Sequence, residues 1–195
     1  MGCLYGPDNV TGMTAIVGLV QSGAVYIGGD SAGVSGLSLT VRADTKVFRK
    51  NQYLFGFTTS FRMGQLIRYS LKLPKPKGEL DAFMATTFID ALRDCLKTGG
   101  WAAKENDREE GGTFLVGVRG KLFAVYDDYQ VGKPADGFAA VGCGDQIALG
   151  ALHATADAGL SPRRRVKRAL AAAERFSAGV RGPFICLKAP VGRKS

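Results

Sequence analysis

Several features that would narrow the class of this protein at once are missing from its 195 residues. No apolar run approaches the roughly 20 residues that a membrane-spanning helix needs, so an integral membrane protein is not expected. Residues 1–12 lack the basic start and the apolar centre of a signal peptide, and Gly6 stands where a myristoylation signal has Ser or Thr. We therefore expect a cytoplasmic protein.

Cysteine and histidine are also scarce. The cysteines are Cys3, Cys95, Cys143 and Cys186, and none of them has the close spacing of a metal-binding or redox motif. The single histidine, His153, falls in an alanine-rich segment with helical character, where a surface position is expected. We therefore expect reduced thiols, no metal ion and no cofactor.

Charge is the first positive feature of the sequence. The net charge is +9, from 26 basic and 17 acidic residues, which permits contact with polyanions or acidic partners without requiring it. The densest basic run, 163–168, lies in a helix predicted to begin at Ser161–Pro162. It fits a solvated helix face, a contact with an acidic neighbouring subunit, or a nucleic-acid surface. Because it lacks the interleaved aromatic residues of single-strand binders, nucleic acid is not expected as a partner.

Hydrophobic patterning predicts one α+β domain over residues 14–195, preceded by a leader or propeptide at 1–13. Residues 30–36 and 97–112 are expected to be loops. The order is strands, two helices, strands, two helices and a last strand, which is typical of two face-to-face sheets with helix pairs outside. The predicted strands are 14–20, 24–29, 37–41, 45–48, 53–58, 113–118, 121–126, 138–141 and 184–187. The predicted helices are 60–73, 79–96, 146–158 and 161–176.

Three polar residues beside the first strands carry the functional prediction. Thr14, Asp30 and Lys46 follow one another at intervals of sixteen residues. A threonine hydroxyl is a weak nucleophile until a base takes its proton, and a free α-amino group with a pKa of about 8 can do so. Lys46 would favour the neutral form of that amine, and Asp30 would hold Lys46 and balance its charge. The pattern indicates an N-terminal threonine hydrolase.

Two segments that follow strands are candidates for stabilising an oxyanion. Gly56–Ser60 lies between a strand and a helix, so its backbone N–H groups, that of Ser60 above all, are expected to point at the developing charge. Gly142–Gly144 ends a later strand in the same way. It is not a phosphate-binding loop, because no Gly-Lys-Ser/Thr follows it.

With these residues in place, the chain resembles the proteasome β-type and HslV-like threonine peptidases, which have the N-terminal nucleophile (Ntn) hydrolase fold. The shared motifs are T-A-I-V-G-L-V with G-G-D-S, T-K-V-F-R, G-F-T-T-S and V-G-C-G-D, within residues 14–187. The chain also looks like an actinobacterial or phage branch of the family. The resemblance implies a four-layer αββα sandwich, with Thr14 as nucleophile and amine base, Lys46 and Asp30 as the tuning pair, and Ser60 as the oxyanion amide.

The chain departs from the family's pattern around the amine. Cys143 stands where the family usually has serine, and a thiol is a weaker hydrogen-bond partner than a hydroxyl. Glu174 is the nearest match to a late aspartate of the family, and Ser177 matches a serine that often follows it. Ser60 replaces a residue that is commonly glycine. The predicted site includes all four of these residues.

The leader decides whether Thr14 has the free amine that the chemistry needs. Family precursors usually carry Gly before the nucleophile, whereas this chain has Met13 there and Gly12 one position earlier. The alternatives are self-cleavage at Met13–Thr14, translation from Met13 followed by its removal by an aminopeptidase, or a retained leader.

The resemblance therefore implies two functions. The first is a threonine endopeptidase that cleaves peptides or unfolded proteins inside a ring-shaped homo-oligomer, with an ATP-driven unfoldase as partner. The second is a catalytically silent proteasome-fold subunit with a structural or assembly role, for example in a phage particle, that keeps residues 1–13 and is inactive for that reason.

Overall fold

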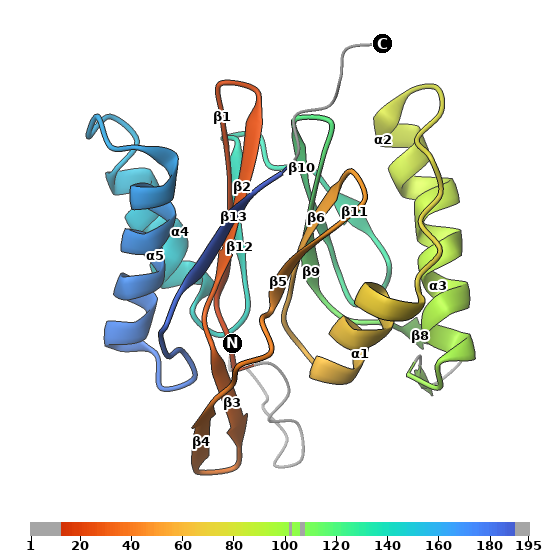
Figure 1. Ribbon diagram of the computed structural model, residues 1–195, viewed down its shortest axis with the longest axis horizontal. Helices are drawn as coiled ribbons and strands as arrows, with labels where there is room; N and C mark the ends of the chain where they lie inside the picture. The colour runs from red at the N-terminus through yellow and green to blue at the C-terminus, as the bar shows by residue number, and fades with distance from the viewer. Residues whose placement is uncertain (1–12, 102, 106–107, 190–195) are drawn as a thin grey trace.

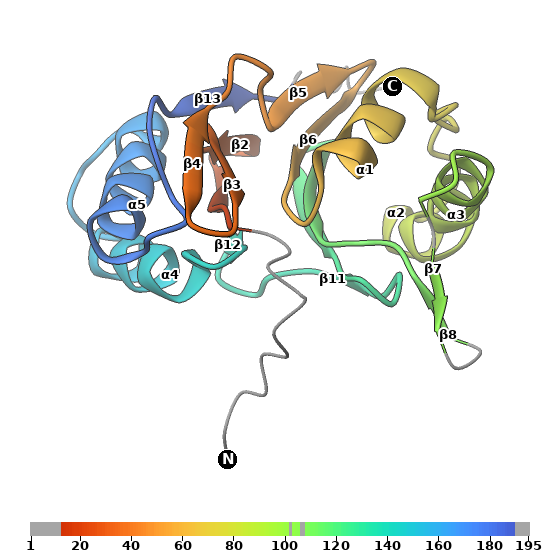
Figure 2. The ribbon, with the colours of Figure 1, turned by 90° about the horizontal axis from the view of Figure 1, so that it is seen from below.

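Two β-sheets lie face to face between two layers of helices in the computed structural model, which describes residues 13–101, 103–105 and 108–189 (Figures 1 and 2). This is the four-layer αββα sandwich that the resemblance implied, and the predicted fold class is confirmed. The predicted order of strands and helices is also confirmed. Within the described residues, no helix combines the length and the apolar character needed to cross a membrane.

The first sheet is antiparallel and is covered on its outer face by α4 and α5 (Figure 1). Its strand order is β12-β1-β2-β13. The strands are β1 (Ile16–Gln21), β2 (Ala24–Gly29), β12 (Phe138–Val141) and β13 (Ile185–Lys188), and the helices are α4 (Asp145–Ala154) and α5 (Pro162–Phe176).

The second sheet has the order β11-β10-β9-β6-β5, and its outer face carries the helices of the chain's middle third. The strands are β5 (Val47–Lys50), β6 (Tyr53–Phe57), β9 (Phe114–Val118), β10 (Lys121–Val125) and β11 (Val131–Gly132). The helices are α1 (Phe61–Gln65), α2 (Leu80–Phe83) and α3 (Ile89–Thr98), continued or joined by the π-helical segments η1 (Leu66–Ser70) and η2 (Met84–Phe88).

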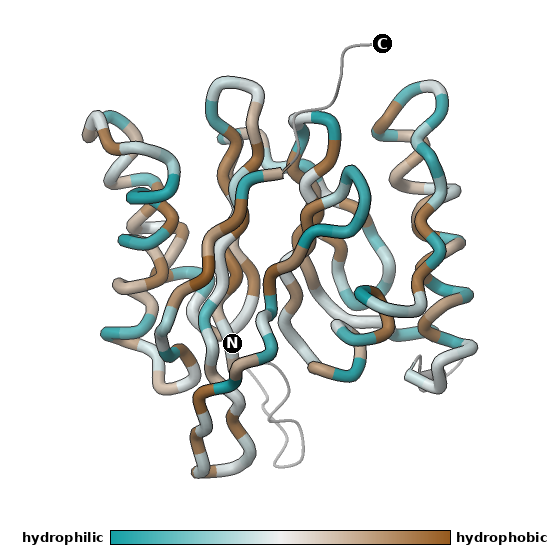
Figure 3. Tube along the Cα trace, in the orientation of Figure 1, coloured by the Kyte–Doolittle hydropathy of each residue, from teal (hydrophilic) through white to brown (hydrophobic). Residues whose placement is uncertain are grey.

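The two faces of β1 are buried in different layers of the core, because successive side chains of a strand point to opposite faces. Ile16 packs between the sheets, whereas Val17 and Leu19 pack under α4 and α5. This explains why β1 reads as a continuous apolar run (brown in Figure 3) rather than as an alternating one. The third layer, between the second sheet and its helices, is rich in aromatic side chains, among them Phe55, Phe88 and Phe114.

The structure corrects four details of the sequence-based assignment. Residues 30–36 were expected to be a loop, but they contain β3 (Ala32–Ser35), which pairs with β4 (Ser38–Val41) in a projecting hairpin. Residues 97–112 contain a second hairpin, β7 (Ala103–Glu105) with β8 (Arg108–Glu110). The short strand β11 was not predicted, and α4 ends at Ala154 rather than at 158. β7 and β8 read A-K-E and R-E-E, without the alternating apolar residues that reveal a half-buried strand, and β3 has only four residues. β4 lies within the predicted strand 37–41.

The basic run on α5 is not a uniformly solvated helix face. Arg163, Arg164, Lys167 and Arg168 are exposed, but Arg165 is only 8% exposed. Its Nη2 donates to the Leu152 carbonyl oxygen at 2.8 Å, in the last turn of α4. A cation is favourable at a helix C-terminus, so Arg165 joins the two helices of this layer.

The close approach of the two sheets predicts that Gly56 tolerates no side chain. A Cβ at this position would lie 2.6 Å from both Ile16 Cγ2 and Ile27 Cγ2, across the interface between the sheets. We expect Gly56→Ala to lower the free energy of unfolding by about 1–3 kcal/mol, measured by urea denaturation. Gly150→Ala on α4, where a Cβ meets open space, is the control and should be neutral or slightly stabilising. Equal stability of the two variants would contradict the packing.

Candidate active site

The register of the β1–β2 hairpin brings the first two predicted site residues together. Ile16 pairs with Gly29, so Ala15 lies opposite Asp30 and Thr14 is one residue further along the chain. The Asp30 backbone N–H continues this pairing by donating to the Ala15 carbonyl oxygen at 3.3 Å. The hairpin register therefore brings the backbone of Thr14 close to that of Asp30.

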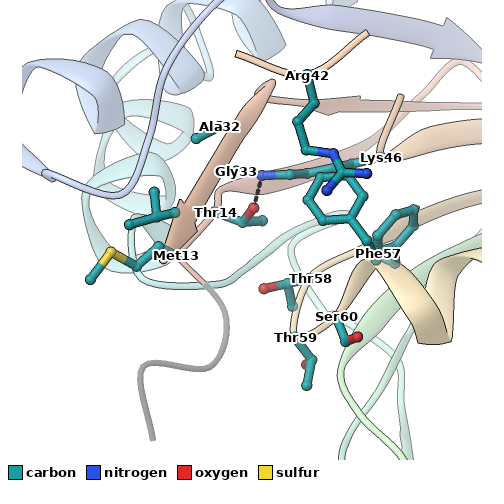
Figure 4. A pocket seen from close by; sticks show the side chains of 12 residues that line it. Met13, Thr14, Ala32, Gly33, Arg42, Lys46, Phe57, Thr58, Thr59 and Ser60 are labelled. Atoms are coloured by element: carbon teal, nitrogen blue, oxygen red, sulfur yellow. Dashed lines mark hydrogen bonds between the residues drawn. The ribbon is translucent and has the colours of Figure 1, made fainter. Parts of the chain in front are cut away.

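Lys46 reaches this point from the other sheet. It precedes β5, and its backbone carbonyl oxygen accepts from the Phe57 N–H at 3.1 Å, which anchors it at the end of the β5–β6 pair. Its Nζ donates to Asp30 Oδ1 at 2.9 Å. It also donates to Thr14 Oγ1, as the dashed line in Figure 4 shows. The exposed fractions are 2% for Thr14, 2% for Asp30 and 3% for Lys46. The structure thus assembles the three residues at the junction of the two sheets.

Asp30 is bonded on both of its carboxylate oxygens. Besides Lys46, Oδ1 accepts from the Ala15 N–H at 3.2 Å, and Oδ2 accepts from the N–H groups of Ala32 at 2.9 Å and Arg181 at 3.3 Å. Burying a charge is costly unless it is paired and hydrogen-bonded. One ammonium and three backbone amides compensate this carboxylate, and they also fix its orientation.

Two effects act in opposite directions on the pKa of Lys46. Burial lowers the pKa of Lys46 from its ordinary value, and the charge and hydrogen bond of Asp30 oppose that shift. Burial is the larger effect, so the net direction is downward. The group with the lowered pKa is thus the ammonium that contacts the Thr14 hydroxyl.

Cys143 lies on the other side of Thr14. Strand β12 pairs with β1 in the register Ile16 to Val141, which brings the residues after β12 next to Thr14. The Thr14 N–H donates to Cys143 Sγ at 3.3 Å, and Sγ lies 3.3 Å from Ser177 Oγ. Gly142 allows this approach, because it has φ +105° and a Cβ there would lie 2.3 Å from the Thr14 carbonyl oxygen. Cys143 therefore contacts the nitrogen of Thr14 directly, and Ser177 is connected to it through Cys143.

The other two predicted site residues are engaged in local structure. Glu174 lies on α5, and its Oε1 accepts from the Gly182 N–H at 2.9 Å, so it binds the loop after α5 rather than the reacting residue. Ser60 lines the pocket in front of Thr14 and caps α1, with its Oγ accepting from the Arg62 N–H at 3.0 Å. Its own N–H donates to the Thr58 carbonyl oxygen at 2.7 Å. The Ser60 N–H can therefore bind an oxyanion only if it first releases the Thr58 carbonyl oxygen.

The pocket in front of Thr14 has a volume of about 140 Å³. Thr14 and Lys46 line it, together with the start of β3 on one side and residues 57–61 on the other. Its charged wall was not predicted from the sequence: the Arg42 guanidinium lies 3.7 Å from the centroid of the Phe61 ring and binds Asp44 through Nε at 2.7 Å and Nη2 at 2.6 Å. The only sequence signal for Arg42 was its closeness to Lys46, which does not distinguish it from other surface arginines.

Metal-binding side chains are sparse around this pocket. Among the described residues, no three His, Cys, Asp or Glu side chains are grouped so that they could hold a metal ion. The chemistry that the arrangement offers is that of a hydroxyl beside an ammonium and a carboxylate.

Comparisons with known proteins give the fold. No protein-family model and no curated protein matches the sequence. Among solved structures, BPH of Thiobacillus denitrificans matches with a TM-score of 0.78 at 18% identity, covering 93% of this chain and 100% of that one, and BPH has also been solved in complex with epoxomicin. HslV of Trypanosoma brucei has a TM-score of 0.66 at 18% identity, with 90% and 98% coverage. Anbu, the ancestral beta-subunit, of Yersinia bercovieri has a TM-score of 0.64 at 13% identity, with 91% and 82% coverage. The chain thus has the proteasome-like Ntn-hydrolase fold.

The buried pair predicts an asymmetry between its two members. Asp30→Ala leaves the Lys46 ammonium and three backbone amides without their acceptor, so we expect a loss of about 3–5 kcal/mol in the free energy of unfolding. Lys46→Met removes the cation but leaves Asp30 its three amide donors, so its loss should be smaller. Chemical denaturation of both variants measures the difference. A larger loss for Lys46→Met would show that the amides do not compensate the carboxylate.

Proposed function

We propose that this chain is a threonine endopeptidase of the N-terminal-nucleophile type. One observation carries the proposal: Lys46 Nζ contacts both Thr14 Oγ1 and Asp30 Oδ1 at the floor of the pocket. The resemblance of the sequence motifs and the shared fold support it. Its single domain begins at Thr14, with residues 1–13 as leader.

In the proposed reaction, Thr14 Oγ1 attacks the carbonyl carbon of the substrate peptide. The hydroxyl proton passes to the free α-amine of Thr14, which then delivers it to the departing amine of the substrate. Water releases the resulting ester, again with the Thr14 amine as base. Cys143 and Ser177 orient the amine, while Lys46 raises the positive potential around it and Asp30 holds Lys46. The Ser60 N–H binds the oxyanion of the substrate, after the turn at 58–60 opens and releases this N–H from the Thr58 carbonyl oxygen.

The substrate would enter as an extended segment along β3. Within the described residues β3 pairs only with β4, and Ala32, Gly33 and Val34 line the pocket. An unpaired strand edge beside a nucleophile is suited to adding a peptide as a further strand. This backbone recognition favours unfolded chains over folded proteins.

The leader must be removed for this chemistry, because the nitrogen of Thr14 is an amide while Met13 is attached. We propose cleavage at Met13–Thr14, by Thr14 itself or, after translation from Met13, by an aminopeptidase. We also propose that the subunits form a ring-shaped homo-oligomer in the cytoplasm and receive substrate from an ATP-driven unfoldase. The exposed basic residues of α5 and the small residues of α4 are candidate subunit contacts.

A catalytically silent structural subunit is the second candidate function. A Met13–Thr14 peptide bond that persists in the mature protein would favour this function, because Thr14 then has no free amine. Intact mass of the purified protein separates the two functions. Loss of residues 1–13 supports the peptidase, and retention supports the structural role.

The nucleophile is tested on a chain that begins at Thr14. Thr14→Ala should reduce hydrolysis of short fluorogenic peptides by on the order of 10³-fold or more, whereas Thr14→Ser keeps the hydroxyl and the amine and should retain part of the activity. Lys46→Ala should lose about as much as Thr14→Ala, because residues that act as one unit are non-additive. Turnover that survives Thr14→Ala but is lost in Cys143→Ala would assign the nucleophile to the thiol instead.

The pH profile tests the base. Only the neutral amine accepts a proton, so kcat/KM should rise with pH through the pKa of an α-amino group, about 8. If the reaction uses protonated Lys46, the rate should fall again at higher pH, and the lowered pKa of Lys46 places that fall below the ordinary lysine value of about 10.4. Initial rates between pH 5 and pH 10 measure both limbs. A rate independent of pH across the first limb would exclude the amine as base.

A further inference from the structure

The loop that joins α5 to β13, here called the 177–183 loop, contacts the candidate site at two separate points. At one point the Arg181 N–H donates to Asp30 Oδ2 at 3.3 Å. At the other, Ser177 Oγ lies 3.3 Å from Cys143 Sγ. Between them Gly179 is buried so closely that a Cβ there would lie 2.8 Å from Cys143 Sγ and 2.5 Å from Met13 Cβ. One short segment therefore touches both the carboxylate side and the thiol side of Thr14.

Two side chains fix this loop from outside the reacting centre. Glu174 Oε1 accepts from the Gly182 N–H at 2.9 Å. Ser31, which is 5% exposed and follows Asp30 in the chain, donates through Oγ to the Pro183 carbonyl oxygen at 2.7 Å. The Ser31 N–H also donates to the Arg181 carbonyl oxygen at 2.8 Å. Arg181, the residue whose amide binds Asp30, is thus held through its neighbours on the chain.

We propose that Glu174 and Ser31 are positioning residues, which hold the 177–183 loop so that the Arg181 amide stays on Asp30 and Ser177 stays on Cys143. Neither side chain touches the reacting atoms. The kinetic consequences of this inference rest on the proposed function, whereas the placement of the loop is independent of it. It also gives a role to Glu174, which the sequence analysis matched to a late aspartate of the family.

The consequence for Lys46 follows from the bonding of Asp30. Oδ2 has two donors, Ala32 and Arg181, while Oδ1 serves Ala15 and Lys46. If the Arg181 amide withdraws, Oδ2 keeps only the Ala32 donor, so the carboxylate is held less firmly and Lys46 Nζ is positioned less precisely against Thr14 Oγ1. A displacement of about 1 Å at a reacting centre costs on the order of 10²-fold in rate.

The loop should remain folded without the Glu174 bond. Val180 is fully buried in the core beneath α4 and α5, and Ser177 closes α5 by donating its N–H to the Ala173 carbonyl oxygen at 2.8 Å. Removing the Glu174 carboxylate therefore loosens the loop around Gly182 and weakens the contacts of Ser177 Oγ and Gly179 with Cys143, while Val180 and the Ser177 N–H keep the chain in place. Such a change affects positioning more than global stability.

Kinetics on the chain that begins at Thr14 test the proposal. Glu174→Ala and Ser31→Ala should each lower kcat by about 10–100-fold with KM changed by less than about twofold, because neither side chain lines the pocket. Glu174→Gln keeps an oxygen that accepts from the Gly182 N–H and should stay within about threefold of the parent. Arg175→Ala, an exposed neighbour on α5, is the matched control. The double variant should lose less than the product of the two single losses, since both act on one loop.

Alkylation of Cys143 by iodoacetamide, followed by peptide mass spectrometry, reports on the loop without any turnover. Glu174→Ala should speed it several-fold by releasing Ser177 and Gly179 from Sγ, and Glu174→Gln should leave it unchanged. If the parent chain shows no turnover, the proposed function fails while alkylation still decides the positioning. Should Glu174→Ala not fold, Ser31→Ala carries both measurements. Unchanged kcat and unchanged alkylation in the alanine variants, an equal loss in Glu174→Gln, or a change confined to KM would each overturn the proposal.

Discussion

The buried pair of Lys46 and Asp30 is the interaction on which the candidate site depends. Its two members come from different sheets, so the pair forms only when the sheets are packed face to face. Taking both charges out of water is expensive, and a single hydrogen bond between them does not offset that cost. Backbone amides from three further places, before β1, at the start of β3 and after α5, complete the compensation. The site is therefore a product of the whole fold rather than of one motif.

The two sides of Thr14 have different chemistry. On one side its hydroxyl contacts a buried ammonium whose pKa is lowered by burial. On the other its nitrogen faces the exposed residue Cys143, whose sulfur is a weaker acceptor than a hydroxyl oxygen. The first side is rigid and enclosed, and the second is more open. This division matches the reaction proposed for Thr14, in which the hydroxyl attacks and the nitrogen accepts the proton.

The 177–183 loop connects these two sides. It reaches Asp30 through a backbone amide and Cys143 through the Ser177 hydroxyl, so a change in its position alters both at once. The loop is bonded to Glu174, which lies on α5, and to Ser31, which follows β2 after one residue. Three consecutive residues therefore have three contacts: Asp30 binds Lys46, Ser31 binds the 177–183 loop, and Ala32 lines the pocket.

By itself the sequence determined the fold class, the order of the main strands and helices, and the grouping of Thr14, Asp30 and Lys46. Local periodicity predicts the strands and helices and their order. The four-layer arrangement and the roles of the three residues followed from the resemblance of the motifs to a known family. Tertiary structure alone decided that Glu174 binds a loop, that the Ser60 amide is engaged in a turn, and that Arg42 forms a pocket wall. It also decided that Arg181 donates to Asp30. These contacts join segments far apart in sequence, and several of them use backbone groups. Because nearly every residue has the same backbone groups, the type of residue at a position does not reveal such a contact.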